Sequence, residues 1–391
     1  MLNLKTPCFI VNEEELRSNI NNLHKALQAT WGNYIIGYSC KTNSLPWILN
    51  FYKLNNCYLE VVSSTEYKLA KKIGYSIDNI VFNGPNKEKE SFIEALKNNC
   101  IVNIDSKKEI EWLKEEEFTS EIKVGIRINF NLEKECPGET EFGDEGSRFG
   151  FSVEKGELEK SIDEINSIKN VKVVGIHLHN GTKTRSLNVY KTLAKKACDL
   201  KKLFKYDLEY VDLGGGFYGG LEDKPSYYDY MRLIEQELSK EFDKEKTKLI
   251  IEPGTALIAS PVDFLCEVVD VKDNFKGRIV TVNGSRNDID PLFVKRRYFY
   301  EISTKYTSKI NIQTVCGYTC MEKDRIMKIE AKEELSVGDR ILFNKVGSYT
   351  MCLSPLFIEY FPRVYLKDLK GNYKCIREPW GIEEYLQKSY I

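Results

Sequence analysis

Short apolar runs alternate with amphipathic stretches between residues 34 and 255. The runs are rich in β-branched and aromatic residues, and the stretches between them have helical periodicity, which is typical of repeated βα units around a parallel sheet. Eight strands with intervening helices favour a closed β/α barrel over an open sheet. The predicted strands are residues 34–40, 57–62, 80–83, 101–105, 122–129, 171–179, 208–213 and 248–252.

The pattern changes after Pro261, where strand-like runs follow one another and helical periodicity is nearly absent. Strands are predicted at residues 264–271, 278–282, 310–315, 325–329 and 339–343. The opening residues 6–11 form one more strand-like run that could join them. The chain is therefore predicted to be an α/β barrel of residues 12–258, with an all-β domain built from residues 1–11 and 259–391.

An acidic, glycine-containing segment at residues 133–147 interrupts the barrel pattern. Long irregular connections in such folds are often binding or catalytic loops. We expect this segment to be a mobile loop on the functional rim of the barrel.

Charge and cysteine content narrow the choice of partners. The chain has 57 basic and 58 acidic residues, so its net charge gives no electrostatic reason to bind nucleic acid or an anionic membrane. Eleven scattered cysteines without paired spacing indicate reduced thiols and a cytoplasmic location. No apolar run approaches the roughly 20 residues that a membrane span needs. We expect a small-molecule substrate, and no metal site is predicted.

Lys41 follows the first predicted strand directly, at the end of the barrel where reactive groups collect. A lysine in a loop is more often solvated and inert. Partial desolvation at the end of an apolar strand would instead lower its pKa and make the amine nucleophilic.

Other strand ends carry polar residues that belong at the same barrel mouth. Three consecutive glycines could form a tight turn or expose backbone N–H groups to a phosphate. His177 and His179 share one face of their strand, and His179, nearer the end, is the better candidate to reach a ligand. Glu252 ends an apolar strand, so burial would require a positively charged partner. The remaining candidates in this set are Arg127, Gly214, Gly215 and Gly216.

Taken together, these residues resemble the fold-type III pyridoxal-phosphate (PLP) decarboxylases, the family of diaminopimelate, ornithine and arginine decarboxylases. The resemblance covers most of the chain, and its specificity comes from the order and spacing of several short motifs. In the barrel these are Lys41-Thr42-Asn43, Val61-Val62-Ser63 with Glu66, Ser147-Arg148-Phe149-Gly150, His179-Asn180-Gly181-Thr182, Gly214-Gly215-Gly216 and Glu252-Pro253-Gly254. Beyond it they are Gly317-Tyr318-Thr319-Cys320 with Asp324, and Gly347-Ser348-Tyr349.

The resemblance implies a PLP-binding TIM barrel, as in alanine racemase, followed by a β domain. It also implies roles for individual residues: Lys41 would hold PLP as an aldimine, His179 would stack on the pyridine ring, and Glu252 would pair with the ring nitrogen. A carboxylate there keeps the nitrogen protonated and favours a quinonoid, which supports decarboxylation. Further cofactor contacts would come from Arg127, Thr182, Gly214, Gly215, Gly216, Gly254 and Tyr349.

Cys320 resembles the proton donor of the family, which reaches the substrate carbon from a neighbouring subunit. The resemblance therefore implies a homodimer with shared active sites. Arg286, Asp288, Met321 and Asp324 would lie near the substrate.

The chain departs from the family pattern at three positions, so the substrates of the family are not assigned to it directly. Thr255 stands where an arginine commonly contacts the phosphate, and Tyr318 replaces a proline. Met321 replaces the acid that recognises the distal amine, so we expect a preference for a neutral or anionic distal end, with Arg286 as the pairing group. Asp288 or Asp290 could instead bind an amine.

The sequence predicts a PLP-dependent decarboxylase of an amino acid or an amino-acid conjugate. One alternative is diaminopimelate decarboxylase itself, with a rearranged distal site. A racemase or epimerase on the same barrel is a second, although alanine racemases place an arginine at the ring nitrogen where this chain has Glu252. A non-catalytic, PLP-binding regulatory homologue is a third.

Overall fold

The computed structural model describes residues 4–390, and it separates into two compact units. One unit comprises Asn19–Ala256. The other combines the chain before residue 19 with the chain after residue 256. The sequence-based prediction had put the first boundary at residue 12, whereas contacts divide the chain inside the first helix, α1 (Glu13–Thr30).

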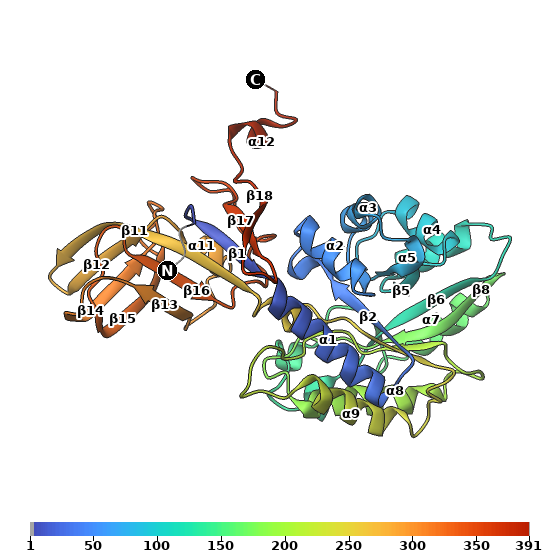
Figure 1. Ribbon diagram of the computed structural model, residues 1–391. Helices are drawn as coiled ribbons and strands as arrows, with labels where there is room; N and C mark the ends of the chain where they lie inside the picture. The colour runs from blue at the N-terminus through green and yellow to red at the C-terminus, as the bar shows by residue number, and fades with distance from the viewer. Residues whose placement is uncertain (1–3, 391) are drawn as a thin grey trace. The chain divides into compact units, whose positions relative to one another are not determined.

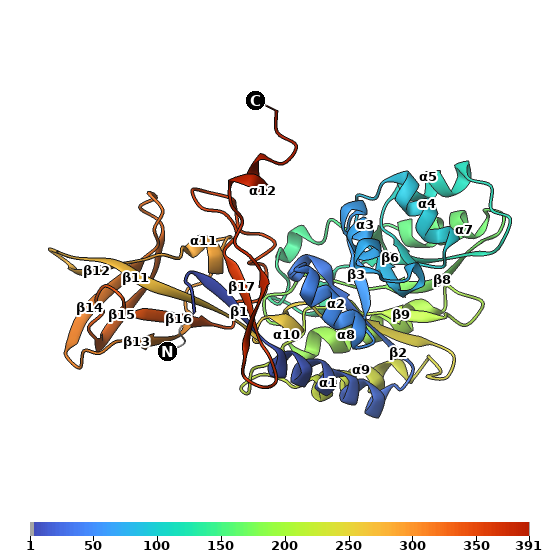
Figure 2. The ribbon, with the colours of Figure 1, turned by 45° about the horizontal axis from the view of Figure 1, so that its top comes forward.

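The first unit contains the predicted eight-stranded parallel barrel, which is confirmed (Figures 1 and 2). The strands follow the order β5-β4-β3-β2-β10-β9-β8-β6, and pairing between β5 and β6 closes the sheet. A short strand, β7 (Phe151–Ser152), pairs with β6 outside the ring. The barrel strands are β2 (Tyr34–Ser39), β3 (Tyr58–Val61), β4 (Ile80–Phe82), β5 (Ile101–Ile104), β6 (Ile122–Asn129), β8 (Val171–His177), β9 (Tyr210–Asp212) and β10 (Lys248–Ile251).

Amphipathic helices connect the strands and cover the outside of the barrel (Figure 1). Local sequence sets several of their ends: Ser63 caps α3 by accepting from the Glu66 N–H, and Gly74 ends it in a left-handed conformation. The connecting helices are α2 (Pro46–Leu54), α3 (Ser64–Ile73), α4 (Lys89–Lys97), α5 (Lys107–Glu115), α7 (Glu157–Asn166), α8 (Leu187–Lys201) and α9 (Tyr227–Leu238).

The barrel interior is apolar at one level and polar at the next. Ile35, Val174, Tyr210 and Ile250 form a buried apolar cluster. The Tyr210 ring lies against Gly175, where an added Cβ would come within 2.2 Å of it. Because side chains alternate along a strand, the inward positions two residues further on, such as Asp212 and Glu252, lie closer to the carboxyl ends of the strands. The candidate site therefore lies above a tightly packed apolar layer of the barrel interior.

The second unit is a mixed β structure, as predicted after Pro261, with only short helices. β1 (Cys8–Asn12) pairs antiparallel with β11 and parallel with β17, so the opening run does join this sheet. None of the described helices is both long and apolar enough to cross a membrane. The other elements are β11 (Val262–Asn274), β12 (Gly277–Val282), β13 (Phe299–Ser303), β14 (Lys309–Cys316), β15 (Arg325–Glu333), β16 (Arg340–Asn344), β17 (Arg363–Lys367), β18 (Tyr373–Arg377), α10 (Thr255–Ile258), α11 (Arg286–Ile289) and α12 (Ile382–Leu386).

Candidate active site

Lys41 lies in a single 3-10 turn, Cys40–Thr42, directly after β2. Its Nζ donates hydrogen bonds to Ser39 Oγ at 2.7 Å and to Glu60 Oε2 at 2.6 Å. The Glu60 side chain is almost fully buried, whereas 39% of the Lys41 side chain is exposed. The amine is thus oriented from inside the barrel, while part of the Lys41 side chain remains exposed.

Glu252 follows β10 and is held by groups from two other strands. Its Oε1 accepts a 2.5 Å hydrogen bond from Asn83 Nδ2, and its Oε2 lies 3.5 Å from His177 Nε2. Burial raises the pKa of Glu252, but His177, a hydrogen bond with Asp212 and the charge of Lys41 outweigh it, so the pKa lies below its ordinary value. Glu252 is therefore a carboxylate at neutral pH, and the sequence-based expectation that it needs a cationic neighbour agrees with this arrangement.

His179 is held as a neutral imidazole. Its Nδ1 accepts a 3.2 Å hydrogen bond from the Gly215 N–H, which requires Nδ1 to be unprotonated. Burial, followed by the positive charge of Arg127, lowers the pKa of His179 to about 3. Its ring lies nearly parallel to that of His177, with centroids 6.3 Å apart.

The glycine loop passes too close to its neighbours to carry side chains. Gly214 has φ +67°, and a Cβ there would lie 2.3 Å from His179 Nδ1. A Cβ on Gly215 would lie 2.1 Å from the Glu252 carbonyl oxygen. The Gly214 N–H already donates to Asp212 Oδ1 and the Gly215 N–H to His179, so of the three glycines only Gly216 has no backbone N–H hydrogen bond within the described chain.

Arg127 connects the site to the segment after β6. Its Nη1 donates to Asp105 Oδ2 at 2.8 Å, and its guanidinium lies over the Phe149 ring, 4.4 Å from the centroid. Asp105 also accepts from the Gly150 N–H at 2.7 Å. Arg127 is therefore positioned by an ion pair that simultaneously anchors the segment containing Phe149 and Gly150.

A cavity of about 450 Å³ opens beside Arg127 and His179, and the acidic segment 133–147 lines much of it. This segment is tied to the turn after His179, because Thr140 and Thr182 form a β-bridge and the Glu141 N–H donates to the Gly181 carbonyl. The predicted rim loop thus lies at the candidate site. Its predicted mobility stays a prediction.

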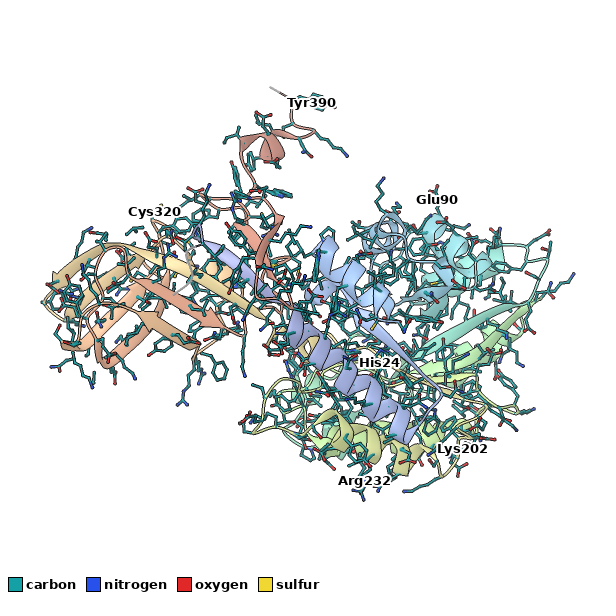
Figure 3. The ribbon with its side chains drawn as sticks, viewed as in Figure 1. His24, Glu90, Lys202, Arg232, Cys320 and Tyr390 are labelled. Carbon is teal, nitrogen blue, oxygen red and sulfur yellow. The ribbon has the colours of Figure 1, made fainter. Side chains whose placement is uncertain are left out.

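Several other predicted site residues lie in the second unit. Cys320 is exposed on the loop between β14 and β15, as Figure 3 shows. Met321 beside it is half-buried. Tyr349 is 40% exposed and has φ +55°, which is unusual for a residue with a side chain.

The structure assigns structural contacts to two residues that we expected near the substrate. Asp324 is buried and accepts hydrogen bonds from Ser285 Oγ, Thr319 Oγ1 and the Arg286 N–H, so its carboxylate holds the Cys320 loop together. Arg286 donates from Nε and Nη2 to Asp290 Oδ2 at 3.0 and 2.8 Å. An anionic ligand would have to compete with Asp290 for this guanidinium.

Asp288 lies beside them as a buried carboxyl group. It accepts from the Ser285 N–H at 2.8 Å, and burial raises its pKa to about 7. Its contact with a substrate stays a prediction.

Several residues of the buried network received no role from the sequence: Ser39, Glu60, Asn83, Asn103 and Asp212. Each is a polar residue at or near the end of an otherwise apolar strand, which was the signal used for Glu252. The same reasoning, applied to every strand, would have found Glu60 and Asp212.

Comparison with known proteins agrees with this geometry. Residues 16–259 match the family model for the pyridoxal binding domain of pyridoxal-dependent decarboxylases, and residues 260–347 match the model for their C-terminal sheet domain. Diaminopimelate decarboxylase of Methanocaldococcus jannaschii is 27% identical, covering 99% of this chain and 91% of that protein. The Staphylococcus aureus enzyme of the same name is also 27% identical, covering 88% and 84%.

Solved structures give the same result. A crystal structure of the M. jannaschii enzyme has a TM-score of 0.88 at 26% identity and covers 99% of this chain and 93% of that one. A viral arginine decarboxylase, from Paramecium bursaria Chlorella virus, shares the fold, with a TM-score of 0.78 at 19% identity over 93% and 96% of the two chains. The two family models together span residues 16–347, and the chain therefore belongs to the pyridoxal-dependent amino-acid decarboxylases.

Proposed function

We propose that this decarboxylase acts at the mouth of its barrel and uses Lys41 as the lysine that binds PLP. The observation that carries the proposal is the position of the Lys41 amine, which Ser39 and Glu60 hold from neighbouring strands, on a side chain that is 39% exposed. A structural lysine would have no need of such an oriented and open amine.

The residues around Lys41 fit PLP chemically. They offer an amine, a carboxylate, a neutral imidazole face and a glycine loop in which Cβ atoms at Gly214 and Gly215 would collide with neighbours. PLP, when bound, supplies an electron sink for the electron pair that carbon dioxide leaves behind.

Each residue would then act on a defined atom. Glu252, as a carboxylate, holds a proton on the pyridine nitrogen, and His179 presents its uncharged ring face. Gly216 has a backbone N–H available for the phosphate, and Thr182 and Tyr349 would add hydroxyl groups. Gly254 serves close packing, because a Cβ there would lie 2.0 Å from Thr42 Oγ1.

Cys320 would donate a proton to the substrate carbon from a second subunit, which makes the active form a homodimer. Its exposed thiol supports this role, since a donor to a neighbouring subunit must be accessible. We further infer a cytoplasmic location, because all eleven cysteines are free thiols in the structure.

The substrate class follows from the distal contacts. Met321 offers no charge, and Arg286 is already paired with Asp290, so a substrate with a neutral distal end fits this set best. Diaminopimelate is the second candidate, favoured by the curated relatives of that name and by the buried Asp288 carboxyl, which could pair with an amine.

Carbon dioxide release tests the proposal. Purified protein with added PLP is incubated with diaminopimelate, ornithine, lysine, arginine and N-acylated or carboxylated analogues, and Lys41→Ala serves as the inactive control. We expect the protein to decarboxylate a substrate with a neutral distal end at a higher kcat/KM than diaminopimelate. If diaminopimelate is instead the better substrate, and Asp288→Ala loses that preference, the protein is a diaminopimelate decarboxylase. If no compound releases carbon dioxide, the proposal is contradicted.

A further inference from the structure

A chain of buried polar groups runs through the barrel beneath the candidate site. The Tyr210 hydroxyl donates to Asn103 Oδ1 at 2.9 Å, and Asn103 Nδ2 donates to Asn83 Oδ1 at 2.9 Å. Asn83 Nδ2 in turn donates to Glu252 Oε1. Asp212 lies beside this chain and accepts from Asn103 Nδ2 at 3.3 Å. Five side chains, which lie in or directly after β4, β5, β9 and β10, thus form one connected network.

The charges in this network do not balance if every carboxyl group is ionised. Asp212 is fully buried and Glu252 is 5% exposed, and carboxyl oxygens of the two lie within 4.8 Å of each other and of a His177 nitrogen. The third buried carboxylate, Glu60, is already paired with Lys41. Two like charges this close in a buried site repel each other strongly, which favours retention of a proton by one of the two carboxyl groups.

The surrounding groups decide which of the two is protonated. Glu252 has the Asn83 amide at 2.5 Å, His177 at 3.5 Å and an attraction to Lys41, all of which favour its anion. Asp212 has only the Gly214 N–H and the Asn103 amide, while burial and the negative charge of Glu252 raise its pKa. Glu60 adds a further negative charge, and Tyr210, which also faces Asp212, offers no cation.

We propose that Asp212 is protonated at neutral pH and donates a hydrogen bond to Glu252, as a positioning residue for that carboxylate. The hydrogen bond holds one negative charge on Glu252 and keeps it directed at the atom it pairs with. The relation to the cofactor rests on the proposed function, whereas the protonation of Asp212 can be tested without any cofactor. The simpler alternative is an ionised Asp212 that only accepts from the Gly214 N–H.

Infrared spectroscopy of the cofactor-free protein tests the protonation directly. At about pH 8.5, where an ordinary aspartic acid is ionised, the wild type should show a protonated-carboxyl band that disappears in Asp212→Asn. Asp288→Asn is compared separately, because burial also raises the pKa of Asp288. Asp199→Asn, at an exposed position outside the network, should leave the band unchanged. No loss of a protonated-carboxyl band in Asp212→Asn overturns the proposal.

PLP binding by variants distinguishes a protonated Asp212, which donates a hydrogen bond to Glu252, from an ionised Asp212. Asparagine resembles a protonated aspartic acid, because it keeps an acceptor for Gly214 and a donor for Glu252. Asp212→Asn should therefore bind PLP within about threefold of the wild type, whereas Asp212→Ala should bind at least about tenfold more weakly. Equal losses in both variants contradict the proposal, and circular dichroism verifies that each is folded. If the wild type itself binds no PLP, the proposed function fails, while the infrared result still decides the state of Asp212.

Discussion

Among single residues, Lys41 has the most specific surroundings. Its amine is held by two oxygens inside the barrel, and the rest of the side chain extends toward the mouth. Many surface lysines pair instead with exposed carboxylates, as Lys68 does with Glu88.

We therefore expect the purified protein to be yellow and to lose the colour on borohydride reduction, with the label in the peptide that contains Lys41. Lys41→Ala should remain folded and carry no covalent label. Lys202→Ala, at a surface position of the same unit (Figure 3), should be labelled like the wild type. Mass spectrometry of the digested protein checks all three, and a label on another lysine would contradict the assignment.

The sequence made Lys41, His179 and Glu252 candidates because each stands at the end of a predicted strand. It could not show which other side chains contact them. Asn83 contacts Glu252 although β4 and β10 are far apart in the sequence and are separated by β3 and β2 in the sheet, because closure of the barrel brings their ends together. The role of a buried polar residue depends on which side chains face it across the barrel, and that is decided by strand register and tilt.

At the scale of elements, the eight barrel strands were predictable because each is an apolar run between helices with clear periodicity. Three strands of the second unit, β13, β17 and β18, were not predicted. Their burial patterns alternate and include exposed or half-buried charged residues, such as Glu301, Arg363 and Lys374. A strand with one solvated face and few apolar residues has too weak a pattern to distinguish it from a loop.

The glycine loop after β9 should not tolerate side chains. In Gly215→Ala the new methyl group would lie 2.1 Å from the Glu252 carbonyl oxygen, so the backbone must move. We expect a loss of about 1–3 kcal/mol in the free energy of unfolding, as for other overpacked sites, together with weaker PLP binding.

Chemical denaturation and PLP titration measure these effects. Gly381→Ala is the matched control, because its new Cβ would have no neighbour closer than 3.7 Å. Equal stability of the two variants would show that the loop is less tightly packed than the structure indicates.

The turn at α11 should make stability depend on pH through Asp288. Burial raises the pKa of this carboxyl group in the folded protein to about 7, so the folded state binds the proton more tightly than the unfolded chain does. The resulting stabilisation is complete below about pH 4 and is lost as the pH rises through about 7. Asp288→Asn should remove this dependence and be more stable than the wild type at pH 8, by on the order of 2 kcal/mol.

Unfolding measured between about pH 4 and pH 8 tests this expectation. Asp199→Asn should follow the wild-type curve. Parallel curves for Asp288→Asn and the wild type would mean that Asp288 titrates normally and is not desolvated.

At the scale of the whole molecule, the proposed homodimer predicts complementation between two inactive proteins. Cys320→Ala should retain PLP while turnover falls by on the order of a hundredfold, as for the loss of a positioned acid. Lys41→Ala should be inactive. After equal amounts are mixed and exchange subunits, half of the dimers are hybrids with one intact site each, which gives about a quarter of wild-type activity.

Carbon dioxide release before and after exchange measures the recovery. Cys352→Ala, the other exposed cysteine, should be fully active alone. Absence of recovery after exchange has been demonstrated by mass spectrometry would contradict a site shared between subunits.

The position of β1 between β11 and β17 has a consequence for biosynthesis. Cys8 to Val11 are buried by strands that begin at Val262 and Arg363, so β1 leaves the ribosome about 250 residues before its first sheet partner. At a translation rate of roughly 5–20 residues per second, this apolar strand has no sheet partner for on the order of ten seconds or more. During translation the barrel can fold before β1 has any sheet partner. A ribosome that stalls while it translates the barrel therefore leaves β1 as an exposed apolar strand, to which chaperones can bind.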